Sequence, residues 1–189
     1  MIQTEPTPNP NALKFMPLRD VRGNKGPLHY KKDSDKNPKE ESDIANSLFG
    51  IKGIKDVFFG SDFITIGKED IVEWEEIKEP IIFLIEANSG LPFVKEKIKP
   101  ACDTINSDAG ESKVIKTIKK LLDERVRPAV AMDGGDILFH GYHESIVKLE
   151  MYGACSGCPS SSATLKMGVE NMLKHYIPEV RKVEQVYEN

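Results

Sequence analysis

The sequence predicts an α+β protein built from two small domains, and three observations lead to this fold class. The chain has 189 residues, which is enough for two hydrophobic cores. Short apolar runs of strand length alternate with stretches in which apolar residues recur at helical spacing. A stretch rich in Gly, Pro, Asp and Ser separates the two patterned halves. We therefore expect domains at 1–90 and 112–189, joined by a linker at 91–111 with a short ordered piece around 93–98.

The first half opens with turn residues that lead into a short extended run ending near Phe15. Residues 22–41 are polar and punctuated by Gly and Pro, which predicts a long loop. Ser42 or Asp43 is expected to cap a short helix, because their side chains can accept hydrogen bonds from the first turn, and Gly50 is expected to end it.

Two apolar runs, Ile54–Phe59 and 63–66, flank the turn residues 60–62 and predict a β-hairpin. Residues 73–87 then carry apolar side chains at helical spacing, and Pro80 is expected to start or kink that helix. This half offers no catalytic constellation. Its aromatic side chains are interpreted as core or as surface facing a partner: Phe58, Phe59, Phe63 and Trp74.

The second half is expected to follow the order helix, strand, strand, helix, strand (αββαβ). An amphipathic helix begins near Ser112, and Pro128 is expected to end or bend it. The segment Asp133-Gly134-Gly135-Asp136 is interpreted as a turn, because Gly adopts backbone angles that other residues resist and Asp can bond nearby amides.

Two strands are expected at 137–142 and 146–152, and the second alternates apolar and charged residues, so one of its faces should be buried and the other wet. A helix is expected after Pro159, since proline is favoured in a first helical turn, and Pro178 should stop it. Residues 180–186 fit a last strand.

Composition excludes several classes of protein. The formal net charge is −4, which argues against nucleic acid as the main partner. The longest apolar run covers 81–85, far short of the ~20 residues of a membrane helix, so no membrane association is expected. The N-terminus lacks the basic and apolar regions of a secretory signal. We expect a cytoplasmic bacterial protein, or an organellar matrix protein whose leader has been removed.

Cys155 and Cys158 form the C-x-x-C pair that carries the predicted chemistry, at the junction of a strand and a helix. The start of a helix presents unpaired amides and the positive end of its dipole, which predicts thiolates at this position. Gly153 and Gly157 would let the backbone turn around a bulky ligand. Inert thiols are not expected in a turn near solvent. The third cysteine, Cys102, lies in the linker.

Such a pair can bind an iron–sulfur cluster, exchange disulfides or bind zinc. A dithiol oxidoreductase of the thioredoxin kind has its C-x-x-C near a βαβ unit, whereas the strands expected here form a hairpin with no parallel crossover. Zinc takes about four ligands, and His140, His143 and His175 do not stand at ligand spacing from the pair. Both readings are kept as alternatives to cluster binding.

The number of thiols predicts how a cluster would be held. A cubane cluster usually takes four thiolates, and the motif of one chain offers two. Two chains would supply Cys155 and Cys158 twice, at a symmetric interface. A cluster held partly by this association should be exposed and labile, which suits a cluster donor better than an electron-transfer protein.

Two parts of the sequence carry a resemblance to one family. Residues 133–136, the two strands that follow, and Gly153-Ala154-Cys155-Ser156-Gly157-Cys158-Pro159-Ser160-Ser161 closely resemble the C-terminal domain of the NifU-like (Nfu) scaffold family. Residues 7–15, the stretch from 48–49 to 57–60, and residues 62–66 resemble the Nfu N-terminal domain. The resemblance covers nearly the whole chain except the linker and the polar stretch 22–41.

The resemblance implies a protein without enzymatic turnover. Its members bind a [4Fe–4S] cluster between two subunits, with [2Fe–2S] as the other cluster type to consider here, and deliver it to apo iron–sulfur proteins. The positions that match the ligand cysteines are Cys155 and Cys158. The implied partners are a second copy of the chain, the receiving apo-proteins and upstream assembly proteins. Cys102 matches no family position, and residues 133–136 match a signature for which we expect only a turn role.

Overall fold

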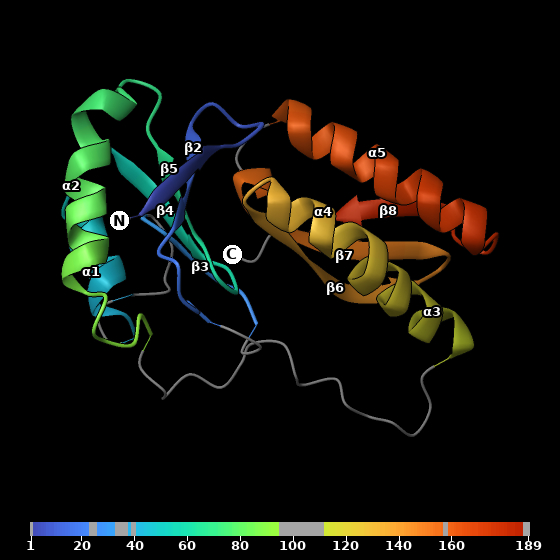
Figure 1. Ribbon diagram of the computed structural model, residues 1–189. Coiled ribbons are helices and arrows are strands. Elements are labelled where there is room, and N and C mark those ends of the chain that lie inside the picture. The colour runs from blue at the N-terminus through green and yellow to red at the C-terminus, as the bar shows by residue number, and fades with distance from the viewer. Residues whose placement is uncertain are drawn as a thin grey trace.

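The computed structural model forms two β-sheets, each covered by its own helices (Figure 1). It describes residues 2–22, 26–32, 38, 41–94, 112–156 and 159–186. Each sheet has its own cluster of buried apolar side chains. The predicted α+β class with two domains is thereby confirmed.

The first sheet has five strands in the order β1-β2-β5-β4-β3, and every neighbouring pair is antiparallel. The predicted hairpin is confirmed as β4 and β5, with Val57 opposite Ile66. The strands are β1 (Gln3–Pro6), β2 (Ala12–Met16), β3 (Leu28–Lys31), β4 (Ile54–Phe59) and β5 (Ile64–Lys68).

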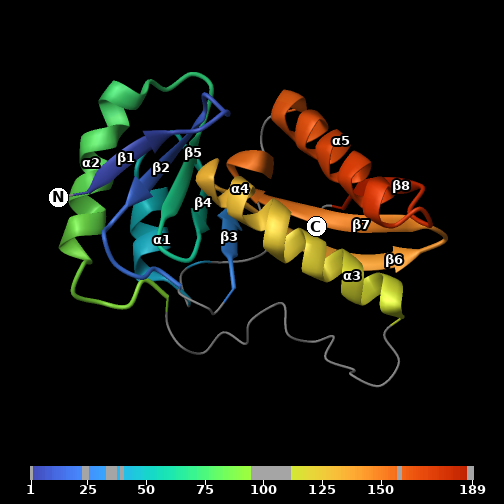
Figure 2. The same ribbon diagram turned by 45° about the vertical axis from the view of Figure 1, so that its right-hand side comes forward.

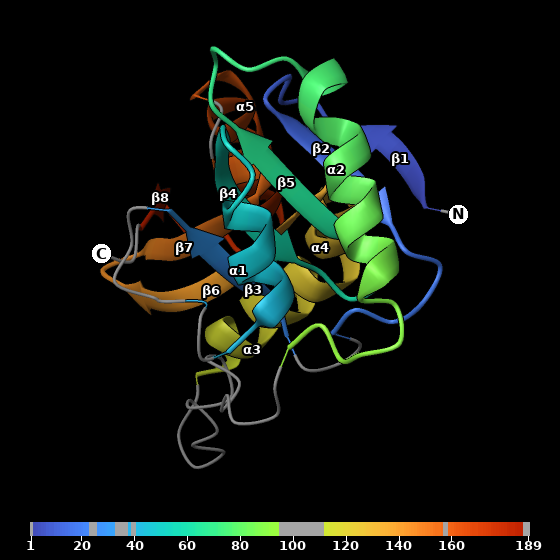
Figure 3. The same cartoon turned by 90° about the vertical axis from the view of Figure 1, so that its left-hand side faces the viewer.

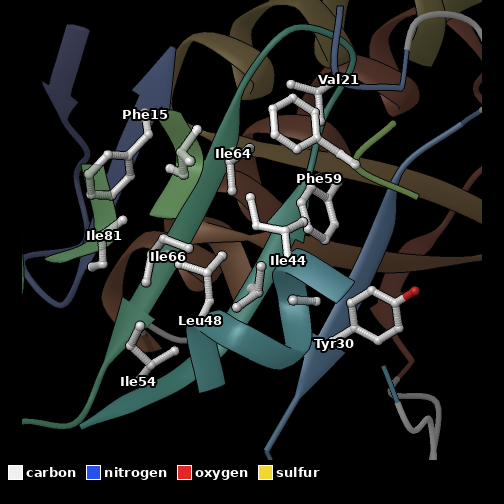
Figure 4. Packing of buried hydrophobic residues seen from close by; sticks show 14 of the residues in the cluster. Phe15, Val21, Tyr30, Ile44, Leu48, Ile54, Phe59, Ile64, Ile66 and Ile81 are labelled. Atoms are coloured by element: carbon white, nitrogen blue, oxygen red, sulfur yellow. The ribbon is translucent and has the colours of Figure 1, made fainter. Parts of the chain in front are cut away.

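Helices α1 (Asp43–Phe49) and α2 (Trp74–Ala87) cover one face of this sheet (Figure 3). The predicted cap is confirmed, because the Ser42 hydroxyl accepts a hydrogen bond from the Ala45 amide at 3.1 Å. Figure 4 shows Phe15, Leu48 and Ile81 pointing into the core between helices and sheet.

Three expectations for the first half need correction. Strand β3 lies inside the stretch 22–41 that we expected to be a loop, because Leu28–Lys31 pairs with β4 and buries His29 and Tyr30. Strand β1 was not expected at all. Helix α2 begins at Trp74, so Pro80 lies inside it and does not start it.

The expected linker begins with ordered residues. Phe93 is buried in the first core, and its carbonyl accepts a hydrogen bond from the Ser42 hydroxyl at 2.6 Å. Residues 95–111, including Cys102, lie outside the described residues.

The second sheet has the order β6-β7-β8 (Figure 2). Strands β6 and β7 form an antiparallel hairpin, and β8 pairs with β7 in parallel. The predicted order of helix, strand, strand, helix and strand is confirmed. Its elements are α3 (Lys113–Leu121), the π-helical segment η2 (Leu122–Val126), α4 (Arg127–Met132), β6 (Gly135–His143), β7 (Ile146–Gly153), the 3₁₀ turn η3 (Ala154–Ser156), α5 (Pro159–Tyr176) and β8 (Lys182–Gln185).

Pro128 does not end the first helix of this domain, which continues to Met132. The backbone passes through the π-helical segment just before the proline. A π turn accommodates a residue that cannot donate to the regular ladder, so the helix is interrupted locally and then resumes. Within the described part of the chain, no helix has both the length and the apolar character needed to cross a bilayer.

Candidate functional site around Cys155

Cys155 lies in the 3₁₀ turn that links the end of β7 to α5. Its side chain packs into the second core and is only 6 % exposed. This corrects the expectation of a thiol near solvent. Cys158 and Gly157 lie outside the described residues, so the structure places one member of the C-x-x-C pair and leaves the other a prediction.

The surroundings of Cys155 favour a neutral thiol. Burial, followed by the negative charges of Asp133 and Asp136, raises the pKa of Cys155 to about 12. The predicted thiolate is therefore wrong for Cys155 in the protein without a ligand, and for Cys158 it stays a prediction. The physical reason is that the side chain points back toward the start of β6, where Gly135 and the two carboxylates lie, so that desolvation and like charge outweigh any effect of the α5 dipole.

Gly135 makes room for this thiol. A Cβ atom at position 135 would lie 2.7 Å from the Cys155 sulfur and 2.7 Å from the Tyr152 carbonyl oxygen, so only glycine fits. Strand pairing places Gly135 directly opposite Gly153, whose φ of +63° favours glycine for a different reason. Gly135 therefore forms the wall against which Cys155 packs, a role beyond the turn that we predicted, whereas Gly134 lies against Thr7 and Thr65 of the first domain.

The sequence carried a signal for this wall. The predicted hairpin has its turn at 143–145, and counting outward from that turn brings 135 opposite 153, next to Cys155. Two glycines that face each other across a hairpin, two residues before a cysteine, indicate a close approach of the two backbones there.

Asp136 holds this region through Arg127. The Arg127 guanidinium donates two hydrogen bonds to the Asp136 carboxylate, at 2.9 and 2.8 Å, and a third at 3.2 Å to Asp123. The hydrogen bonds to Asp136 are the main cause of a raised pKa at Arg127. Asp136 also accepts a hydrogen bond from the Ile137 amide at 2.7 Å. The ion pair of Arg127 and Asp136 therefore connects α4 to the first residues of β6, beside the thiol.

The histidines do not join this site. His140 lies 2.6 Å from the buried carboxylate of Glu150, and the Tyr152 hydroxyl donates to the same carboxylate at 2.8 Å. Glu150 is thus buried on the strand face expected to be wet, because these two partners cover it. Among the residues that the structure describes, no group of three or more His, Cys, Asp or Glu could hold a metal ion.

The strand pairing corrects one argument against dithiol chemistry. We expected no parallel crossover, yet β7, α5 and β8 form a parallel βαβ connection, with Cys155 at the turn between β7 and α5. The sequence signal was weak because the last strand has four residues. Topology therefore does not exclude a dithiol oxidoreductase, and the choice depends on the thiol's surroundings.

Comparison with protein families gives two matches on this chain. Residues 2–90 match the family described as "Scaffold protein Nfu/NifU N terminal". Residues 118–184 match the family described as "NifU-like domain". Together the matches cover both sheets and the Cys155 turn.

Curated relatives match along the whole chain. A protein of Drosophila ananassae called "NFU1 iron-sulfur cluster scaffold homolog, mitochondrial" is 49 % identical over 190 residues, covering 99 % of this chain and 64 % of the relative. The protein of the same name from Drosophila virilis is 49 % identical over 192 residues, covering 100 % of this chain and 62 % of the relative. The chain thus spans less than two thirds of the length of these relatives.

A solved structure matches the chain over part of its length. The solution structure of a NifU-like protein from Saccharomyces cerevisiae is 32 % identical, with a TM-score of 0.46, and covers 52 % of this chain and 86 % of that one.

Proposed function

This chain belongs to the NifU-like (Nfu) family, and from that premise we propose that it carries an iron–sulfur cluster bound by Cys155 and Cys158 and passes it to other proteins. The observation that carries the proposal is the position of Cys155. It lies in the 3₁₀ turn directly after β7, its sulfur packs against the backbone at Gly135, and it stands three residues before a second cysteine.

The residues around Cys155 suit a thiolate ligand that forms only when the cargo binds. Thiolates are the usual ligands of iron–sulfur clusters. Because the pKa of Cys155 is raised to about 12, binding has to displace its proton, so cluster uptake should weaken as the pH falls. Such coupling makes binding weaker than it would be at a preformed thiolate, which is suitable for a cluster that must be released.

We infer that two chains share one cluster, because the motif of one chain offers two thiols and a cubane cluster usually takes four. The receiving partners would be apo iron–sulfur proteins, and upstream assembly proteins would supply the cluster. The relatives are named as mitochondrial proteins, which supports an organellar matrix location and gives no support to the expected bacterial cytoplasm. We propose no enzymatic turnover. The division into domains at 1–90 and 112–189 remains part of the proposal.

The test is anaerobic reconstitution with iron and sulfide, followed by absorbance, iron content and size on a column. The wild-type chain should give a brown dimer with about one cubane cluster per two chains. The variants Cys155→Ala and Cys158→Ala should stay colourless and monomeric. Cys102→Ala is the matched control, because it removes a thiol outside the motif, and it should load like the wild type. A colourless wild type, or a brown Cys155→Ala variant, would contradict the proposal.

The parallel βαβ connection keeps dithiol exchange as a second candidate. Its nucleophile would have to be a thiolate, and attack slows when the thiolate fraction is small. The raised pKa and burial of Cys155 oppose this activity, and leave Cys158 as the attacking group. The second candidate would be established if the protein reduced insulin faster than an equal concentration of a small thiol does.

A further inference from the structure

The outward face of the first sheet, opposite α1 and α2, is unusually well buried. Antiparallel sheets commonly leave one face in water. Here Phe58 and Thr65 are both 0 % exposed, although their neighbours along the strands, such as Phe59 and Ile64, are the ones that point into the first core. Figures 1 and 2 show the second domain on this side of the sheet, so the second domain provides the cover.

Two hydrogen bonds join this face to the second domain, one at the turn that holds Cys155 and one at the residue before β6. The Thr65 hydroxyl donates to the Gly134 carbonyl oxygen at 2.7 Å. The Asn9 side-chain amide donates to the Ala154 carbonyl oxygen at 3.2 Å, while its own oxygen accepts from the Asn11 amide at 3.0 Å. Thr65 and Asn9 are both buried, and these bonds satisfy donors that would otherwise be costly to bury.

The shapes of the two surfaces also correspond. A Cβ atom at Gly153 would lie 2.9 Å from the Phe58 ring, and one at Gly134 would lie 3.0 Å from the Thr65 hydroxyl. The glycines thus bring the backbone of the turn against the side chains of the sheet. The Tyr152 ring stacks on Phe58 with centroids 6.3 Å apart and planes at 12°, and the His29 ring meets both rings edge-on.

We propose that the outward face of the first sheet is a docking surface for the chain's own cysteine turn, and that docking shields Cys155 in the protein without cargo. The surface consists of Asn9, His29, Phe58 and Thr65, and its occupant consists of residues 134–135 and 152–155. The occupant is the same chain because its hydrogen bonds, glycines and aromatic ring fit this surface residue by residue.

Docking would oppose the symmetric contact through which two chains share a cluster. This consequence depends on the function proposed above, whereas the docking itself does not. Loading would require the two domains to separate, so a partner that binds the outward face of the first sheet would promote loading.

The test measures how fast iodoacetamide alkylates Cys155 in the full chain carrying Cys102→Ser and Cys158→Ser, which leaves one thiol. Asn9→Asp keeps the acceptor for Asn11 but replaces the donor with a carboxylate oxygen. Thr65→Val keeps the shape and removes the hydroxyl. Each should speed alkylation about tenfold, the effect of losing one buried hydrogen bond, and the double variant should speed it further.

Matched controls make the same chemical changes away from the interface. Asn88→Asp alters an amide that donates to a carbonyl of its own helix, and Thr117→Val alters an exposed hydroxyl that does the same. In both controls, Cys155 should be alkylated at the background rate, which is the rate in the chain that carries only Cys102→Ser and Cys158→Ser. A double variant Asn9→Asp/Thr65→Val that also reacts at the background rate, or controls that speed up equally, would overturn the proposal.

A second measurement needs no variant and covers the case in which a variant does not fold. Nuclear Overhauser contacts between the Phe58 and Tyr152 rings should be present in the unaltered chain, and their absence would overturn the proposal. Neither experiment uses iron. The docking proposal can therefore be overturned while the proposed carrier function stands, and the carrier function can be overturned while the docking proposal stands.

Discussion

The two sheets differ in what covers the face turned away from their own helices. On the first sheet, Phe58 and Thr65 are fully buried beneath the other domain. On the second sheet, Lys148 is exposed, and Glu150 is buried by its neighbours His140 and Tyr152. The first outward face is therefore an interface, and most of the second is ordinary surface with one local polar cluster.

This difference teaches that the pattern of residue types along a strand indicates burial but does not identify what provides it. The outward face of β4 carries Asp56 and Phe58, and that of β7 carries Lys148, Glu150 and Tyr152, so both faces combine charge with an aromatic ring. Only the interface face has to fit a second surface, and that surface contains the cysteine proposed to bind the cluster.

The largest effect on stability should come from truncating, one at a time, two neighbouring phenylalanines on β4. Phe59→Ala opens a cavity in the first core and should lower the free energy of unfolding by about 3–5 kcal/mol. Phe58→Ala should cost less, because the domains can separate instead of keeping a cavity, but it should speed alkylation of Cys155. Urea unfolding followed by circular dichroism checks the first effect. Equal costs for the two variants would mean that the interface is as firmly packed as the core.

Replacing two glycines of the second domain by alanine should change the free energy of unfolding in opposite directions. Gly153→Ala places a side chain at a φ of +63° and within 2.5 Å of the Gly134 carbonyl oxygen, so it should lower stability by about 2 kcal/mol or more. Gly168→Ala, inside α5 with nothing within 4 Å, should raise stability by about 1 kcal/mol. Thermal unfolding of both variants measures the difference, and a stabilised Gly153→Ala variant would refute the close packing at the turn.

A smaller effect concerns pH. The folded protein holds the Cys155 proton more tightly than the unfolded chain, because the pKa of Cys155 is raised to about 12. The stability from this group is fully present below the ordinary thiol pKa of about 8.5 and is lost as the pH rises toward the folded value. From pH 8 to about pH 10, the wild type should lose about 2 kcal/mol more than Cys155→Ser, which does not titrate there. If urea unfolding gives the same loss of unfolding free energy for the wild type and for Cys155→Ser, the thiol is not shielded.

Much of the local structure follows from short stretches of sequence. Ser42 caps α1 because its hydroxyl stands three residues before the amide that it serves, and the hairpin of β4 and β5 follows from apolar runs on either side of a Gly-Ser-Asp turn. The α+β class and the position of Cys155 between a strand and a helix depend on the same local signals. For this reason they could be predicted.

The strand pairings that sequence reasoning missed join residues that are distant in the chain. Strand β3 has only four residues inside a polar stretch and becomes a strand only because β4 supplies an edge for it. The parallel pairing of β7 with β8 joins residues more than thirty positions apart. Neither pairing leaves a strong pattern in the segment itself, because the hydrogen bonds that stabilise it come from elsewhere in the chain.

The sequence alone determined which residue types stand at the cysteine turn: two thiols three positions apart, which follow Gly153 at the end of the second predicted strand. The tertiary structure decided the state of the thiol. Cys155 holds its proton because burial and two carboxylates favour the neutral form, and the turn is covered because Asn9 and Thr65, far away in the chain, donate hydrogen bonds to its backbone. Desolvation and long-range pairing depend on the whole fold, so no local pattern could have revealed them.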